Sequence, residues 1–490
     1  MQTVIEDKDS KELHLSQRFL NPTNILFTLV LVDMFSVSLV VPLLQQYYKN
    51  AGITSASQRE LLSSLFSTSQ IIGGLAIGYL SDTNILSQNQ ILLTSFLGSA
   101  ISYGSLGYGN VLGLKTLIFS RILIGLVKQT MTVSMGLLVK FSSREERSRK
   151  LGRLNGMVTV AWIIGPSVGA LLYKNVHPSA PALLACFLFC VNFVIAVMFL
   201  PDSKHTNKNV TNQNENESTT PTESSKQKGI SKFSSFTTNI QSCFSSKLLG
   251  SVIISNLLFS WVRRATSYQS INSYYETQYN LTPHQRGYLS SYQSILAFIS
   301  QSLLIQPILR LLGGGYTASS NTNNDSGKEE DRQYSGKGER KAAYIGSMVL
   351  CLVALLEIKI SLPLFLSIVC PLIATSYAIM DLSLRSLMTQ ITPKTSINSV
   401  LAAMDVLQNA AAVTVPFYRT FLFQYMSERE EDIDTSNKIV GDPNPRWWLL
   451  SSGLHWLISA LLMFYFLQDK DFEEPPKNNI DKEEQQKKQV

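Results

Sequence analysis

The sequence GRLNGMVTVAWIIGPSVGA, residues 152–170, is apolar enough to lie within a lipid bilayer. Helices in lipid gain no hydrophobic free energy by associating, so they pack where small residues let two backbones approach closely. Small residues recur through this stretch, at Gly152, Ala161, Gly165, Gly169 and Ala170. Pro166 is expected to bend the helix, and neighbouring helices then satisfy the backbone groups that it frees. The stretch predicts a bent membrane helix pressed against a partner; the alternative is an ordinary membrane helix rich in small residues.

Similar apolar segments recur on both sides of this one, in a chain of 490 residues of which 45% are hydrophobic and 16% charged. About 20 apolar residues are needed to cross a bilayer, a length that a soluble core helix rarely requires. We predict twelve spans, at residues 23–47, 60–81, 90–109, 113–139, 152–173, 180–200, 248–274, 287–309, 342–358, 361–385, 396–424 and 447–467. The expected fold is an all-α membrane protein with twelve transmembrane helices in two pseudo-symmetric bundles of six.

Polar segments divide the chain into five parts. Residues 201–247 are rich in Asn, Ser, Thr and Glu and poor in apolar residues, so this cytoplasmic linker is predicted to be disordered. It separates a six-helix bundle at 23–200 from a second at 248–467, which contains another disordered loop at 313–341. Two halves with six spans each indicate a duplicated unit. The ends, 1–22 and 468–490, are expected to be cytoplasmic tails.

Basic residues set the expected orientation, since cytoplasmic loops carry an excess of Lys and Arg. The most basic of these loops contains Lys140, Arg144, Arg147, Arg149, Lys150 and Arg153. When both termini are placed in the cytoplasm, the cytoplasmic loops hold most of the basic residues of the chain. Topology thereby explains the net charge of +7, and no nucleic-acid partner is expected.

Enzyme motifs are missing from the sequence, which has no P-loop, no H-E-x-x-H pattern and no nucleophile elbow. Its five cysteines are scattered, and Cys186 and Cys190 lie in an apolar run without nearby His or acidic residues. We therefore expect no enzymatic activity, no cofactor, no metal and no disulfide framework.

Charged residues inside the predicted spans are the candidate functional residues, because a charge at the bilayer centre costs about 3 kcal/mol or more. Asp33 lies about three turns into the first span, and Arg121 and Lys128 lie seven residues apart on one face of the fourth. Either base could pair with Asp33 when the acid is ionised. Protonation of Asp33 would break such a pair, although a purely structural ion pair is the alternative.

The second half contains two further polar groups. Arg263, Arg264 and Tyr268 are placed in the middle of the seventh span, as part of a binding cavity or as a bridge between helices. Asp381 and Arg385, near the inner end of the tenth span, and Asp405, in the eleventh, are interpreted as a cytoplasmic ion-pair network, with substrate contact as the alternative.

Several of these patterns resemble motifs of the major facilitator superfamily. The small residues of 152–170 resemble its antiporter motif, although the family has Gly where Ala161 and Ala170 stand. Arg121 and Gly125 match its R-x-x-x-G element. The sequence GYLSD, residues 78–82, resembles its G-x-L-x-D loop motif, here without the basic residues that follow in the family.

Asp33 followed by Pro42 resembles the first helix of the drug–proton antiporter branch, which includes the tetracycline exporters. Residues 125–156 also resemble the animal proteins called major facilitator superfamily domain-containing protein 9. The resemblance implies that Asp33 faces a central cavity and binds a proton or a cationic substrate. It also implies a conformational role for Gly78, Asp82, Gly152, Gly165, Pro166 and Gly169.

The expected function is secondary active transport of a small organic solute by alternating access, with proton-coupled antiport implied by the resemblance. The partners would be a small-molecule substrate, protons and the lipid bilayer, and the protein is expected to be a monomer. The alternative is a non-transporting membrane receptor or scaffold on the same fold, which the missing basic residues after Asp82 favour.

Overall fold

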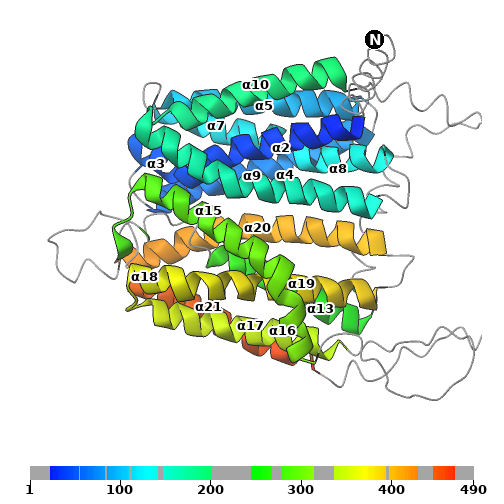
Figure 1. Cartoon of the computed structure of the whole chain (residues 1–490), viewed down its shortest axis with the longest axis vertical. Helices are drawn as coiled ribbons and strands as arrows, with labels where there is room; N and C mark the ends of the chain where they lie inside the picture. The colour runs from blue at the N-terminus through cyan, green and yellow to red at the C-terminus, as the bar shows by residue number, and fades with distance from the viewer. Residues whose placement is uncertain are drawn as a thin grey trace, which may run out of the picture. The chain divides into compact units, whose positions relative to one another are not determined.

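The computed structural model describes residues 22–53, 56–82, 85–109, 113–141, 147–200, 246–266, 278–313, 336–392, 397–428 and 445–468, together with Phe244 and Tyr275. Within these ranges the chain consists of helices joined by turns (Figure 1).

Each of the twelve predicted spans coincides with a helical segment. The segments are α2–α3 (Pro22–Val40, Leu44–Asn50), α4 (Ala56–Asp82), α5 (Gln88–Gly107), α7–α8 (Leu114–Val127, Thr130–Lys140), α9 (Arg147–Asn175), α10 (Ala180–Phe199), α13 (Lys247–Ala265), α15–α16 (Pro283–Ile299, Ile305–Leu311), α17 (Lys337–Glu357), α18–α19 (Leu362–Leu364, Cys370–Ile391), α20 (Ile397–Glu428) and α21 (Pro445–Phe466). Eight helices in the described ranges are long and apolar enough to cross a membrane. The prediction of an all-α membrane fold is therefore confirmed.

The chain forms two compact units, and each draws on separate parts of the sequence. The first comprises Met1–Glu223, Ser267–Phe298 and Ala412–Trp447. The second comprises Ser224–Thr266, Ile299–Ala411 and Trp448–Val490. Three of the five boundaries between the units fall inside α15, α20 and α21, so each of these helices contributes to both units.

The helix α2 is central to the first unit. It packs against α9, α10 and α8, while α10 packs on α5. Figure 1 shows α2 in blue between α9 and the pair formed by α5 and α10. The sequence of α2 is apolar around its whole circumference, which is typical of a helix surrounded by protein or lipid.

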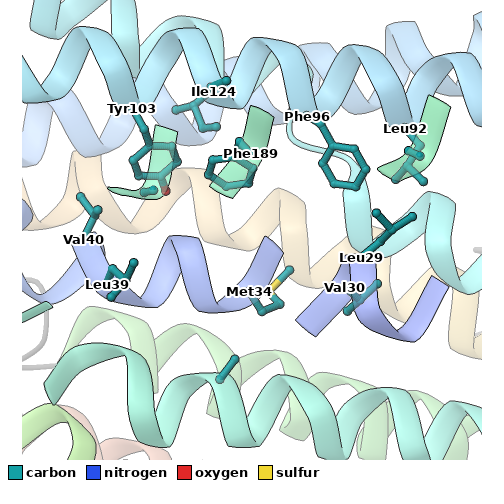
Figure 2. Close-up of a cluster of buried hydrophobic side chains, with 14 of the residues drawn as sticks. Leu29, Val30, Met34, Leu39, Val40, Leu92, Phe96, Tyr103, Ile124 and Phe189 are labelled. Carbon is teal, nitrogen blue, oxygen red and sulfur yellow. The ribbon is translucent and has the colours of Figure 1, made fainter. Parts of the chain in front are cut away.

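Large apolar side chains fill the space between α2, α5 and α10 (Figure 2). Leu29, Phe96 and Phe189 are fully buried there. The rings of Tyr103 and Phe189 stack with their centroids 5.3 Å apart, an arrangement that adds about 0.5–1.5 kcal/mol to burial alone. The interior of this unit is therefore closely packed where α2 faces α5 and α10.

Glycines bring α9 against α2. A Cβ atom at Gly165 would lie 2.8 Å from the Cβ of Ser38, and one at Gly169 would overlap the carbonyl oxygen of Leu39. The Ser38 hydroxyl donates a hydrogen bond to the carbonyl oxygen of Ala161, at 2.9 Å. The predicted close packing of this helix is thus confirmed, and its partner is α2.

Two details of α9 go beyond the prediction or differ from it. Pro166 lies inside the helix, which continues past it to Asn175. Gly152 is exposed, and no described atom lies within 4 Å of the position that its Cβ would take. Its small size therefore serves no close packing, because it lies far from the contact with α2.

Two spans of the first unit that are predicted as single helices are interrupted. A 3-10 turn at Val41–Leu43 separates α2 from α3, where Pro42 has no N–H for helical hydrogen bonding. The fourth span breaks at Lys128 and Gln129, and Lys128 has φ −76° and ψ 82°, outside the helical region. Lys128 is the C-cap of α7, and its N–H still donates to the carbonyl oxygen of Ile124, so α7 carries both Arg121 and Lys128 up to the break.

In the second unit, α19 packs against α13 and α17. Trp456 of α21 is buried, and its ring centroid lies 6.4 Å from that of Phe259 and 5.8 Å from that of Tyr377. Two π-helical segments, Ser300–Leu304 and Phe365–Val369, interrupt the eighth and tenth spans.

Candidate proton and substrate site

Asp33 and Lys128 form an ion pair inside the first unit. Asp33 of α2 is fully buried, and its Oδ1 lies 2.5 Å from Nζ of Lys128. The hydroxyl of Thr130, at the start of α8, donates to the same oxygen at 3.3 Å. No described residue hydrogen-bonds to the second carboxylate oxygen, Oδ2. One oxygen thus holds the ammonium group, and the other can accept a proton without displacing an existing hydrogen bond.

Lys128 lies at the end of α7, just before the break that separates α7 from α8. Its side chain leaves the chain where helical hydrogen bonding stops, and its Nζ lies 4.6 Å from the centroid of the Phe189 ring. An ammonium over an aromatic face gains about 0.5–2 kcal/mol, depending on hydration. Its side chain is 13% exposed, against 0% for that of Asp33. Lys128 is therefore held from two sides, by a carboxylate and by a ring.

Arg121 takes a different place from Lys128. It is buried, hydrogen-bonds with Tyr48, and has its guanidinium carbon 6.0 Å from the centroid of the Phe66 ring. Gly125, one turn further along α7, allows close packing on α4, since its Cβ would lie 2.7 Å from the carbonyl oxygen of Phe66. Of the two bases that the sequence offered to Asp33, only Lys128 forms an ion pair with it among the described residues.

A second buried ion pair was not predicted. Arg419 Nη2 lies 2.9 Å from Oε2 of Glu60, and both side chains are at most 5% exposed. Glu60 is the first residue of the predicted second span, and a charge at the edge of a span is not by itself a signal of function. Arg419 lies within the eleventh predicted span, five residues before its end, so a search for charges anywhere within the spans would have found it.

The polar residues of the seventh span lie at the end of a helix. Arg263 and Arg264 lie in the last turn of α13, not in its middle as predicted, because the helix ends at Ala265. The hydroxyl of Thr266 donates to the carbonyl oxygen of Val262 at that end. Both arginines are exposed within the unit, and the guanidinium carbon of Arg263 lies 5.2 Å from the centroid of the Tyr377 ring. Tyr268 lies outside the described residues.

Asp381 and Arg385 form a pair within α19, with Nε and Oδ1 3.2 Å apart. The Arg385 side chain is 57% exposed, and exposed pairs of this kind contribute about 0.3–0.5 kcal/mol. Gly78 and Asp82 lie in the last part of α4, and Asp405 lies in α20. The side chains of Asp82 and Asp405 are outside the described part of the structure, so their roles stay predictions.

The site combines a buried acid, its basic partner and a second buried pair within a bundle of long apolar helices. Such an arrangement defines a polytopic membrane protein with ionisable groups in its interior, as found in transporters. Residues 26–416 match the Major Facilitator Superfamily. The chain belongs to this superfamily and is a multi-pass secondary transporter, which confirms the predicted family and the expectation that the protein is not an enzyme.

The relatives agree with the predicted branch. The class B tetracycline resistance protein of Escherichia coli is 24% identical over 317 residues, which are 60% of this chain and 77% of that protein. The quinolone resistance protein NorA of Staphylococcus aureus is 24% identical over 181 residues, 37% of this chain and 45% of that protein.

Solved structures agree with the fold. The nucleoside transporter NupG superposes with a TM-score of 0.63 at 12% identity, over 91% of this chain and 99% of that one. At this identity the likeness concerns the fold alone.

Proposed function

We propose that the protein is a proton-coupled antiporter of a small organic solute and that Asp33 carries the coupling proton. The observation that supports this most strongly is the buried pair of Asp33 and Lys128, with one carboxylate oxygen free of hydrogen bonds among the described residues. The relatives whose names record resistance to tetracycline and quinolones support export of a small molecule.

The proton would act by changing the charge beside Lys128. A proton from water on one side of the membrane neutralises the Asp33 carboxylate and weakens its attraction for the ammonium group. The second oxygen of Asp33, Oδ2, can accept either this proton or a hydrogen bond from a polar group of the solute, so the two occupy the site in turn. Protonation on one side releases the solute there, and loss of the proton to the other side lets the carboxylate bind the next solute, which is the exchange that antiport requires.

Alternating access would use the duplicated halves. We propose that the bundles at 23–200 and 248–467 alternate around the site, with Gly78, Asp82, Gly165, Pro166 and Gly169 at the helix contacts that change. Both termini would lie in the cytoplasm, as the basic loops indicate. Asp381, Arg385 and Asp405 would then lie on the cytoplasmic side.

The test is transport by purified protein in liposomes with an imposed pH gradient. Candidate solutes are first screened by counterflow, which needs a working carrier but no gradient. Asp33→Asn should keep counterflow and lose the acceleration that the gradient gives, while Asp33→Glu should retain part of it. Lys115→Gln, which removes an exposed lysine at the start of α7, serves as a control.

Two results would contradict the proposal. Gradient-driven transport that persists in Asp33→Asn would remove Asp33 from the coupling step. A complete lack of counterflow over a broad solute panel would favour the receptor or scaffold alternative.

A further inference from the structure

A cavity in the first unit lies beside the interruption of α2. Val41 and Pro42 of the 3-10 turn form one wall, and Trp162 of α9 and Leu289 of α15 form others. The cavity has a volume of about 40 Å³. A cavity needs at least about 10–15 Å³ to hold one water molecule, so this one has room for a small polar group such as a carboxylate.

Polar groups converge on the same cavity from one face of α15. Arg286, Ser290 and Gln293 line it, at the four- and three-residue spacing that places side chains on one side of a helix. Tyr275 completes the polar wall, and its hydroxyl accepts a hydrogen bond from Gln293 Nε2 at 3.3 Å. Arg286 is only 3% exposed, and its Nη2 donates to Oε1 of Gln46 at 3.4 Å.

A neighbouring face of α15 packs closely on α9, and this contact supports the cavity wall. A Cβ atom at Gly287 would lie 2.7 Å from the carbonyl oxygen of Pro166, which shows how closely the two backbones approach. The hydroxyl of Ser167 donates to that of Ser291 at 2.8 Å. A wall held in this way needs little reorganisation on binding, and such preorganisation favours affinity.

We propose that this cavity binds the acid group of an organic anion and that such anions, with an apolar body, are the substrate class of the transporter. The guanidinium of Arg286 has a permanent charge and a planar fork of donors that matches a carboxylate. Ser290 and Tyr275 add hydroxyl groups, while Trp162 and Leu289 provide apolar surface for the rest of the molecule. Only the transport of these anions rests on the function proposed above; their binding does not.

The experiment measures equilibrium binding to the full-length protein with two ligands of the same size and opposite charge, radiolabelled benzoate and benzylamine. Benzoate should bind more tightly than benzylamine. Arg286→Gln should weaken benzoate binding at least tenfold, and Arg286→Lys should weaken it less, since it keeps the charge and loses the fork. Arg310→Gln, which removes an exposed arginine of α16, should leave binding unchanged.

Ser290→Asp provides a second test if Arg286→Gln does not fold, because it places a negative charge in the cavity without removing the arginine. It should also weaken benzoate binding at least tenfold. The assignment is overturned if benzylamine binds as tightly as benzoate, if benzoate does not bind at millimolar concentration, or if Ser290→Asp and every folded Arg286 variant bind it like the wild type.

Binding and coupling can fail separately in these measurements. Benzoate binding that depends on Arg286, together with gradient-driven transport that persists in Asp33→Asn, would uphold the cavity and refute the coupling. If Asp33→Asn loses gradient-driven transport and neither cavity substitution affects benzoate binding, the coupling is upheld and the cavity assignment is refuted.

Discussion

At the scale of single residues, the two buried ion pairs carry most of the chemical information. Removing two charges from water is costly, and their mutual attraction compensates only when the geometry is good. Asp33 with Lys128 and Glu60 with Arg419 meet this requirement, with nitrogen–oxygen distances of 2.5 and 2.9 Å. Breaking either pair from one side leaves a buried charge without its partner, so single substitutions should be much more harmful than paired ones.

The first prediction concerns the pair at the candidate site. Lys128→Gln should destabilise the protein by about 3–5 kcal/mol, because it leaves the Asp33 carboxylate buried without its counter-charge. The double variant Asp33→Asn with Lys128→Gln should lose less than the sum of the two single changes. Reversible unfolding in detergent measures this coupling, with Lys115→Gln as the matched lysine control. Additive losses would show that the two side chains do not interact.

The second prediction concerns the pair that the sequence did not single out. Arg419→Lys should lower the melting temperature less than Arg419→Gln, since lysine keeps the charge beside Glu60. The glutamine variant should lose about 3–5 kcal/mol, as is typical when one member of a buried pair is removed. Thermal unfolding of both variants beside Arg310→Gln provides the measurement. Equal melting temperatures for the two Arg419 variants would mean that charge does not stabilise this contact.

At the scale of the elements, α9 joins its neighbours through backbone proximity. Its Gly165 and Gly169 contact α2, and Pro166 and Ser167 on the same stretch contact α15. Because lipid provides no hydrophobic drive for this association, the contacts themselves must stabilise it. The interruption of α2 has a different effect, because it places Val41 and Pro42 in the wall of the cavity.

The third prediction follows from these contacts. Gly169→Val should destabilise the protein by about 1–3 kcal/mol or more, because its side chain would meet the backbone of Leu39. Gly152→Ala should be neutral or stabilising by up to about 1 kcal/mol, since that position is open and alanine favours helix. The melting temperature should therefore fall below that of the wild type in Gly169→Val and should not fall in Gly152→Ala. A tolerated Gly169→Val would show that α9 does not lie against α2.

At the scale of the whole molecule, membership of the superfamily makes this a multi-pass transporter, and the basic loops predict its orientation. The described segments of the first unit come from three distant parts of the sequence. Glu60 of α4 and Arg419 of α20 belong to two of these parts, and their ion pair is one of the contacts that join them.

The fourth prediction concerns orientation. Epitope tags at the two ends should both be reached by antibody only after the cells are permeabilised. The physical reason is the excess of Lys and Arg in the loops assigned to that side. A tag inserted between α9 and α10, after Val176, should be reached from the opposite side in intact cells and serves as the control. Antibody binding to either terminal tag in intact cells would contradict the predicted cytoplasmic position of that terminus.

The sequence by itself determined the helical positions, the family and the acid at Asp33, because long apolar runs indicate membrane spans and a charge within such a run is costly unless it has a function. It could not choose between Arg121 and Lys128 as the partner of Asp33, since that choice depends on which of them the packed helices bring to the carboxylate. It also could not bring Glu60 to Arg419 or Arg286 to Trp162. These pairings are long-range contacts between helices, which depend on how side chains pack in three dimensions, and only the tertiary structure decided them.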